Sequence, residues 1–232
     1  MKIKINLKSE QNIELPIQYN HIVQAFIYNN IDEKIAKFLH DKGYVVNNRS
    51  FKLFNFSRIF GNYKIDKDNK KIIFESPIEI IIKTPIEDFA KSLMNNIILN
   101  SNLKLGDNKL NIENYEISSD IIEGSSGEST ICIKTLSPIT TYSTLKELDG
   151  TNYTYYFLPE DPKFENLINN NLKKKAEILN VNFNSGLKIL NYRGKKRIII
   201  YKNFVIKAFD GIFTISGNKE LLNMVLSCRL GK

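Results

Sequence analysis

The sequence predicts an α+β protein made of two tandem domains of the same kind. Its 232 residues suffice for one large domain or for two of about 100 to 120 residues each. An apolar content of 42% and a charged content of 25% are typical of an ordinary globular chain. Strand and helix patterns alternate along both halves, and a loop of Gly and Ser (EGSSGEST, residues 123–130) separates them. We therefore expect domains at residues 1–122 and 123–232.

The first half predicts the order strand, helix, strand, strand, helix, strand. Period-two or β-branched patterns predict strands at Lys2–Leu7, Phe51–Phe60, Lys71–Lys83 and Lys109–Ile117. Apolar residues at helical spacing predict a helix over residues 20–41. A second helix is expected at Glu87–Leu99, because Pro85 suits a helix start. This β-α-β-β-α-β order is that of the ferredoxin-like fold.

The second half predicts the same alternation without its last strand. The expected strands are Thr130–Ile139, Lys188–Tyr192, Arg197–Tyr201, Phe204–Phe209 and Ile212–Ser216. The expected helices are Pro162–Leu179 and Asn218–Ser227. Tight turns are expected at Lys202–Asn203 and Asp210–Gly211. We therefore expect a second ferredoxin-like domain that lacks its closing strand.

Several classes of protein are disfavoured. No apolar run approaches the roughly 20 residues of a membrane helix, so no membrane partner is expected. The start MKIKINLKSE alternates like a strand and does not resemble a secretory signal. Cys132 and Cys228 are too few and too far apart for a disulfide framework or a metal knuckle. A reducing cytoplasm is the expected location.

The net charge of +8 is unevenly distributed. Residues 187–209 contain seven Lys or Arg and no Asp or Glu. Such a basic zone favours a polyanionic partner, because phosphate neutralisation drives sequence-independent binding of nucleic acid. The alternative is a solvated face in a Lys-rich protein.

The common catalytic motifs are missing from the sequence. It has no HExxH, GxxxxGK[ST] or GxSxG motif and no Cys and His cluster at metal spacing. A nuclease of this composition is therefore expected to work without metal or cofactor. In RNA the ribose 2′-OH can attack the adjacent phosphate, so the protein must move two protons and stabilise the phosphorane. His suits the proton transfers, because its unperturbed pKa of ~6.5 lies near neutrality.

The chain has only two histidines, His21 and His40. His21 begins a helix, and a capping or partly buried role is favoured. His40 lies at the end of the predicted helix. Either a favourable interaction with the helix dipole or a catalytic role would explain a histidine there. Alternation after His40 places five side chains on one strand face: Lys52, Phe54, Phe56, Arg58 and Phe60. That face resembles a surface that binds RNA, although packing of the Phe rings in the core is favoured, with Lys52 left beside the loop after His40.

Tyr28 is a third candidate, and helix geometry restricts it. An unbroken helix would put Tyr28 ~18 Å from His40 and ~120° around the axis. The two residues can converge only if the helix breaks between them. Asn29, Asn30 and Asp32 are plausible breakers, and Asn30 or Asp32 could cap a second helix.

Six segments together resemble the CRISPR-associated endoribonucleases of the RAMP superfamily, which cut the repeats of precursor CRISPR RNA. The first three are YNHIVQAFIYNNI, FLH and FKLFNFS in the first half. The others are TLSPI at 135–139, YFLPEDPKFENLINNNLKKKAEIL at 156–179 and AFDGIFTISGNKELLNMV at 208–225. The set spans nearly the whole chain in order.

The resemblance implies paired ferredoxin-like (RRM-like) domains and metal-free cleavage that leaves a 5′-hydroxyl and a 2′,3′-cyclic phosphate. Carried over by position, it gives His40 as general base or acid, Lys52 as phosphorane stabiliser and Tyr28 as aligner, with Tyr44 and Lys42 as substitutes. The expected RNA contacts are Arg49, Arg58, Lys195, Lys196, Arg197 and Lys202. The implied partner is CRISPR repeat RNA; effector-complex subunits and a homodimer remain open.

One departure leaves a second function open. The family has a glycine-rich loop after its last helix, whereas LSCRLGK ends this sequence, with Arg229 at the first expected Gly and only Gly231 remaining. We therefore expect a truncated or divergent member with an exposed strand edge that can pair with another chain. The alternative is an RRM-like protein that binds repeat RNA, or is a subunit of a CRISPR effector complex, without cutting RNA.

Overall fold

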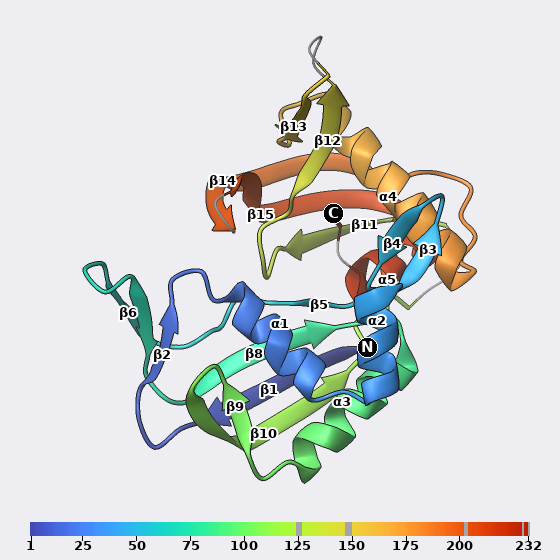
Figure 1. Cartoon of the computed structure of the whole chain (residues 1–232). Helices are drawn as coiled ribbons and strands as arrows, with labels where there is room; N and C mark the ends of the chain where they lie inside the picture. Colours follow the sequence, from blue (N-terminus) through green and yellow to red (C-terminus); the bar gives the residue numbers. More distant parts are fainter. Residues whose placement is uncertain (124–126, 147–149, 202–203, 229, 232) are drawn as a thin grey trace. The chain divides into compact units, whose positions relative to one another are not determined.

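The computed structural model describes residues 1–123, 127–146, 150–201, 204–228 and 230–231 (Figure 1). They form two compact units, Met1–Ser119 and Asp120–Lys232, each with its own hydrophobic core. Ile122 belongs to the second unit, since it packs on that core and its backbone N–H donates to Asn223 Oδ1. The two units are described separately below.

The main sheet of the first unit is antiparallel and has the order β5-β8-β1-β10-β9. Its strands are β1 (Lys2–Lys8), β5 (Asn55–Phe56), β8 (Ile78–Lys83), β9 (Leu103–Leu105) and β10 (Asn108–Ser118). Without the short hairpin strand β9, this is the ferredoxin-like order. Ile3, Ile5 and Leu7 of β1 are completely buried, while the intervening side chains lie on the other face. The α+β class and ferredoxin-like fold predicted for this half are confirmed.

Three helices pack on the buried face of this sheet. They are α1 (Asn20–Asn29), α2 (Glu33–Asp41) and α3 (Glu87–Leu99). The bounds predicted for α3 are confirmed. The single helix predicted over residues 20–41 is instead two helices. The break falls at Asn30–Asp32, among the residues that the sequence analysis named as plausible helix breakers.

Two long strands predicted in the first half are wrong in their extent. Phe51–Phe60 divides into the end of β4 (Arg49–Phe51), a turn where Leu53 has φ of 52°, and β5. Lys71–Lys83 divides at Pro77 into β7 (Lys71–Phe74) and β8. β7 instead forms a small sheet with β2 (Ile13–Pro16) and β6 (Tyr63–Asp66). These strands pair with distant segments, which local alternation does not reveal.

The second unit is built on a three-stranded antiparallel sheet of order β11-β15-β14. Its elements are β11 (Glu128–Lys134), β12 (Thr141–Lys146), β13 (Asn152–Phe157), α4 (Lys163–Leu179), β14 (Lys188–Tyr201), β15 (Phe204–Asn218) and α5 (Lys219–Ser227). Phe164 of α4, Phe213 and Ile215 of β15, and Leu221 of α5 are buried in its core. The described part of this unit has the ferredoxin-like order without a closing strand, as predicted.

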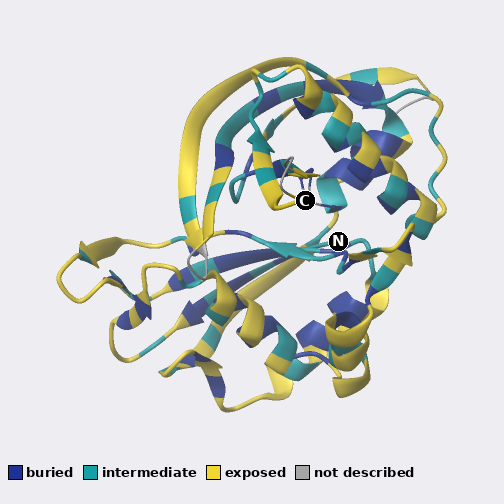
Figure 2. Cartoon of the chain, turned by 45° about the horizontal axis from the view of Figure 1, so that its top comes forward, coloured by how far each residue is buried: buried dark blue, intermediate teal, exposed yellow. Residues whose placement is uncertain are grey.

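β14 and β15 form one long ribbon (Figure 2). The turn predicted at Asp210–Gly211 is wrong, because β15 runs through it and Gly211 pairs with Gly194 of β14. A Cβ on Gly194 would lie 2.6 Å from the Gly211 Cα, so the strands approach too closely for any side chain. The turn expected at Lys202–Asn203 lies outside the described residues. Nearly every residue of β14 is exposed.

No helix among the described residues is long and apolar enough to cross a membrane. The described His, Cys, Asp and Glu side chains include no group of three or more that could hold a metal ion.

Candidate active site at the end of helix α2

Polar side chains of α3 and of its C-cap residue hold the break between α1 and α2. Asn30 is buried; its Nδ2 donates to Phe26 O (2.8 Å), and its Oδ1 accepts from Asn100 Nδ2 (3.0 Å). The Asp32 backbone N–H donates to Ser92 Oγ at 2.7 Å. Asp32 is the N-cap of α2, without a side-chain capping bond. The break therefore depends on hydrogen bonds that replace those lost from the helix.

The end of α2 is closed by a glycine and a tight hairpin. Gly43 has φ of +65°, and its N–H donates to Phe38 O at 2.7 Å. The chain then enters β3 (Tyr44–Val46), which pairs with β4 through a turn in which Asn47 and Asn48 both have positive φ. Asparagine tolerates this conformation, and two such residues form a type I′ hairpin turn. The hairpin returns the chain to the end of α2.

This return brings Lys52 to His40. Lys52 Nζ donates to the His40 carbonyl oxygen at 3.3 Å, across twelve positions of sequence. The imidazole Nδ1 of His40 lies 2.9 Å from Asp41 Oδ1. The His40 side chain is 81% exposed, so it can reach an external substrate. An imidazole and an ammonium group therefore share the exposed end of α2, and a carboxylate contacts the imidazole ring.

Tyr28 lies in α1, before the break, and packs against aromatic residues. Its ring meets Phe54 edge to face at 5.8 Å, and Phe54 stacks on Phe89 at 4.9 Å. Burial raises the pKa of Tyr28, although a hydrogen bond with Gln24 lowers it. Tyr28 thus contacts the segment that follows Lys52, two residues further along the chain.

The other residues considered from sequence have clear places. His21 is exposed in the first turn of α1, and the N-cap is Tyr19, so the predicted capping or partly buried role is wrong. Lys42 is the exposed C-cap of α2. Tyr44 is half-buried against Phe38 (5.1 Å), and burial, with a smaller effect of Asp88, raises its pKa.

The cation and aromatic face predicted around Phe51–Phe60 is only partly present. Phe54 and Phe56 are partly buried and pack on the core of the first unit, in agreement with the favoured prediction that these rings face the core. The Arg58 guanidinium lies over the Phe60 ring at 5.7 Å. Arg49 lies over Phe51 at 5.8 Å, in the hairpin beside His40. Arg49 is therefore nearer in sequence to the end of α2 than Arg58 is, and it belongs to the hairpin that follows α2.

Three of the four basic ribbon residues can be placed on β14. Lys196 forms an ion pair with Glu160, and Arg197 forms one with Asp210 at 3.3 Å. Lys195 is exposed, and within the described part of the chain it has no ion-pair partner. Lys202, like Arg229, lies outside the described residues. Lys195 is thus more available for binding a phosphate than Lys196 and Arg197 are.

Two features of these sites were missed in the sequence, although each had a signal there. Asp41 follows His40 directly, and an Asp beside a helix-end His was the available signal for an orienting carboxylate. The run NYTYYF at 152–157 forms β13, whose tyrosines line a pocket in the second unit. Its concentration of aromatic residues was visible in the sequence.

Two family models match the chain in succession. Residues 14–116 match the model of CRISPR-associated protein Cas6, N-terminal, and residues 121–232 match that of CRISPR-associated protein Cas6, C-terminal. The chain belongs to the Cas6 family. The resemblance stated from sequence is thereby confirmed.

Individual relatives agree over the full length. The chain is 25% identical to "CRISPR-associated endoribonuclease Cas6 1" of Methanocaldococcus jannaschii, over 100% of this chain and 88% of that protein. A solved structure of a Cas6-related gene product from Pyrococcus furiosus matches with a TM-score of 0.77 and 22% identity, over 100% of this chain and 93% of that one. A structure described as a RAMP protein binding different RNA substrates matches with a TM-score of 0.74 and 20% identity, over 100% of this chain and 94% of that one. The Cas6-family fold therefore extends over both units.

Proposed function

We propose that this Cas6-family chain is a metal-independent endoribonuclease that cuts the repeats of precursor CRISPR RNA. Family membership supports the activity and its substrate, since both halves match Cas6 models and the Methanocaldococcus jannaschii relative is named as a CRISPR-associated endoribonuclease. His40, Lys52 and Tyr28 are proposed to carry the reaction.

The observation that carries the site proposal is the hydrogen bond from Lys52 Nζ to the His40 carbonyl. It holds an ammonium group at the same helix end as an exposed imidazole. A phosphodiester placed against that end would meet a proton-transfer group and a cation together, which RNA cleavage requires.

In the proposed reaction the ribose 2′-oxygen attacks the adjacent phosphorus and loses its proton. His40 takes this proton or gives one to the leaving 5′-oxygen, through Nε2, because Nδ1 faces Asp41. The Lys52 ammonium stabilises the charge on the phosphorane oxygens. The P–O5′ bond breaks, leaving a 2′,3′-cyclic phosphate and a 5′-hydroxyl. Tyr28 aligns the substrate from beside Phe54.

The test is cleavage of end-labelled repeat RNA in EDTA by the chain and by His40→Ala. His21→Ala is a matched control, since His21 is also an exposed helix histidine. We expect one cut with a cyclic-phosphate end, slowed about 10²–10⁴-fold in His40→Ala, the range for loss of a general acid or base, and unchanged in His21→Ala. Equal cleavage by His40→Ala would refute the role of His40.

The alternative function is RNA binding without cleavage. Tight binding of repeat RNA by both the parent chain and His40→Ala, with no cut in either protein, would establish it. Cleavage that requires added Mg²⁺ would instead refute the metal-independent mechanism.

RNA contacts are proposed for Arg49, Arg58, Lys195, Lys196, Arg197 and Lys202. A second copy or another effector subunit is proposed to pair with the outer edge of β11, on which no described strand lies. A cytoplasmic location is also proposed; both cysteines are free, with Cys132 exposed and Cys228 buried.

A further inference from the structure

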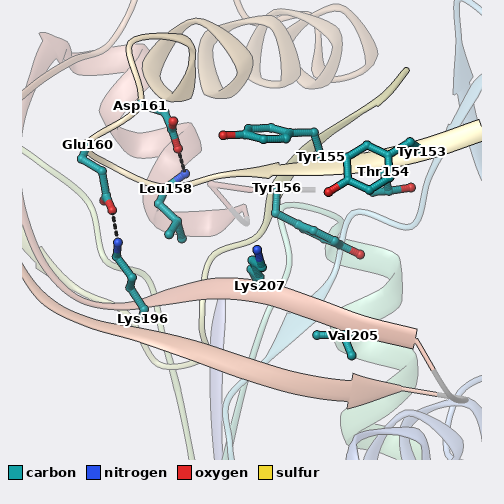
Figure 3. Close-up of a pocket in the computed structure, with 10 residues that line it drawn as sticks. All are labelled: Tyr153, Thr154, Tyr155, Tyr156, Leu158, Glu160, Asp161, Lys196, Val205 and Lys207. Atoms are coloured by element: carbon teal, nitrogen blue, oxygen red, sulfur yellow. Dashed lines mark hydrogen bonds and ion pairs between the residues drawn. The ribbon is translucent and has the colours of Figure 1, made fainter. Parts of the chain in front are cut away.

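The second unit contains a pocket of about 410 Å³ between β13 and the β14–β15 ribbon (Figure 3). This volume falls at the lower end of the range for small-molecule sites. Residues of β13, of the segment after it and of both ribbon strands line the pocket: Tyr153, Thr154, Tyr155, Tyr156, Leu158, Glu160, Asp161, Lys196, Val205 and Lys207. All of these lining residues belong to the second unit.

Aromatic rings form one wall. Tyr156 is half-buried and extends from β13 towards the ribbon (Figure 3). Tyr142 of the neighbouring strand β12 supports it, with ring centroids 5.8 Å apart. Burial, and to a smaller extent Tyr142, raises the pKa of Tyr156, so the ring is a neutral phenol that does not repel an anion. A supported, uncharged aromatic ring is suited to stacking on a nucleobase.

Lysines form the opposite side. Lys207 of β15 points towards the gap beside Tyr156 (Figure 3) and makes no ion pair within the described residues. Lys196 lines the pocket but is held by Glu160, which raises the pKa of Lys196 while its own is lowered. Asp161 is occupied by the Leu158 backbone N–H at 2.6 Å. The pocket therefore presents one available ammonium and a second that an incoming phosphate can draw from Glu160.

We propose that this pocket binds one unpaired nucleotide of the RNA substrate, with its base on Tyr156 and its phosphate on Lys207. The inference rests on the proposed function for the identity of the RNA, but the residues that it assigns are not those proposed to be catalytic. The chemistry it requires is an aromatic base joined to a phosphate, and an RNA strand supplies both in repeating order. A free mononucleotide has the same chemistry and is distinguished by the test.

Binding of labelled repeat RNA would be measured on the full chain carrying His40→Ala, so that cleavage does not interfere. Tyr156→Ala should weaken binding by about tenfold or more, whereas Tyr156→Phe, which keeps the ring, should bind like its parent. Tyr63→Ala, an exposed tyrosine on β6 of the first unit, is the matched control. Thermal melting of each variant confirms that it is folded.

Salt dependence separates the phosphate contact from the base contact. Lys207→Gln should lower the slope of log affinity against log salt by about 0.7, as for the loss of one phosphate contact on a single strand. Tyr156→Ala should leave that slope unchanged, and so should Lys109→Gln, an exposed strand lysine of the first unit. Glu160→Gln should tighten binding, because it releases Lys196 and removes a negative charge.

Two results would overturn the pocket proposal while leaving the ribonuclease proposal intact. In the first, the chain cuts repeat RNA but folded Tyr156→Ala binds it as tightly as the parent. In the second, a nucleoside monophosphate binds at Tyr156 without competing with repeat RNA, which would assign the pocket to a free nucleotide. Failure of the unsubstituted chain to bind or cut repeat RNA would instead refute the proposed function.

Discussion

His40, Asp41 and Lys52 show how few residues define the candidate active site. Asp41 lies beside the imidazole, and Lys52 is hydrogen-bonded to the His40 backbone. Both contacts are exposed to solvent, where ion pairs contribute about 0–1 kcal/mol, so they orient these groups more than they stabilise the fold. Substitutions here should consequently change catalysis with little effect on folding.

Lys52→Ala is expected to lower kcat by about 10²–10³-fold, the loss seen when one group that stabilises transition-state charge is removed. RNA affinity and the melting temperature should change little, because within the described part of the chain the Lys52 side chain makes a single, exposed hydrogen bond. Single-turnover cleavage with saturating enzyme measures this effect. Lys42→Ala is the control; if it abolishes cleavage while Lys52→Ala does not, Lys42 is the stabilising cation.

At the scale of elements, two features decide where side chains are placed. The α1–α2 break turns α2 away from the line of α1, and the β3–β4 hairpin returns Lys52 to the end of α2. In the second unit, the close pairing of Gly194 with Gly211 keeps β14 and β15 continuous past a point where the sequence predicted a turn. A Phe209 ring atom would lie within 3 Å of a Cβ on either glycine, so the ring covers this pair.

Gly211→Ala is expected to destabilise the chain by about 1–3 kcal/mol, because the new methyl group would be forced against the backbone of Arg193 and Gly194. Thermal denaturation followed by circular dichroism would measure the loss. Gly127→Ala is the matched control, since a Cβ there meets nothing within 4 Å. A melting temperature for Gly211→Ala equal to that of the control would contradict the close approach of the two strands.

The Asn30 side chain joins two helices, so its loss should affect both stability and the site. Asn30→Ala removes the acceptor of Asn100 and the donor to Phe26. We expect a loss of about 1–3 kcal/mol, the cost of leaving buried partners unsatisfied. Chemical denaturation measures this loss, and Asn29→Ala, at an exposed neighbouring position, is the control. Equal midpoints for the two variants would show that the break does not depend on Asn30.

At the scale of the whole molecule, two units with separate cores share a net charge of +8, which favours binding of RNA phosphates. Ion pairs decide which cations are available. Lys196 and Arg197 are held by Glu160 and Asp210, whereas Lys195 is exposed without such a partner among the described residues. Lys195 should therefore contribute more to phosphate binding than its neighbours.

Affinity for repeat RNA should fall steeply with salt, and Lys195→Gln should reduce the slope of log affinity against log salt by about 0.7. Arg197→Gln should reduce it less, because Arg197 must first leave Asp210. Equilibrium binding from low to moderate salt measures both slopes. Identical slopes for the parent chain and Lys195→Gln would show that Lys195 makes no phosphate contact.

Pairing at the edge of β11 would be visible in the mass of the particle. If a second copy adds to this edge, light scattering should give a dimer whose population rises with concentration. Cys132→Pro, at an exposed position in the centre of β11, should prevent it, because the Cys132 N–H faces the outer edge and not β15. A monomer at all concentrations would exclude self-pairing and leave another subunit as the proposed partner.

Features that depend on local pattern could be predicted from the amino-acid sequence alone. Periodicity predicted the ferredoxin-like order and the bounds of α3, and the segments around His40 and Lys52 indicated the family now matched by both Cas6 models. Pro85 also marked where a helix starts, and Asn29, Asn30 and Asp32 marked where another could break. These features can be predicted because each depends on residues only a few positions away in the sequence.

Which of the possible long-range contacts form became clear from the folded chain alone. Ser92 and Asn100 hold a break that lies 60 to 70 residues away in sequence, and Asp210 binds Arg197 from the opposite strand. The pocket at Tyr156 exists only because β13 lies beside β15. Hydrogen bonds, ion pairs and cavities of this kind depend on the distance between folded segments, and that distance is absent from any local pattern of residues.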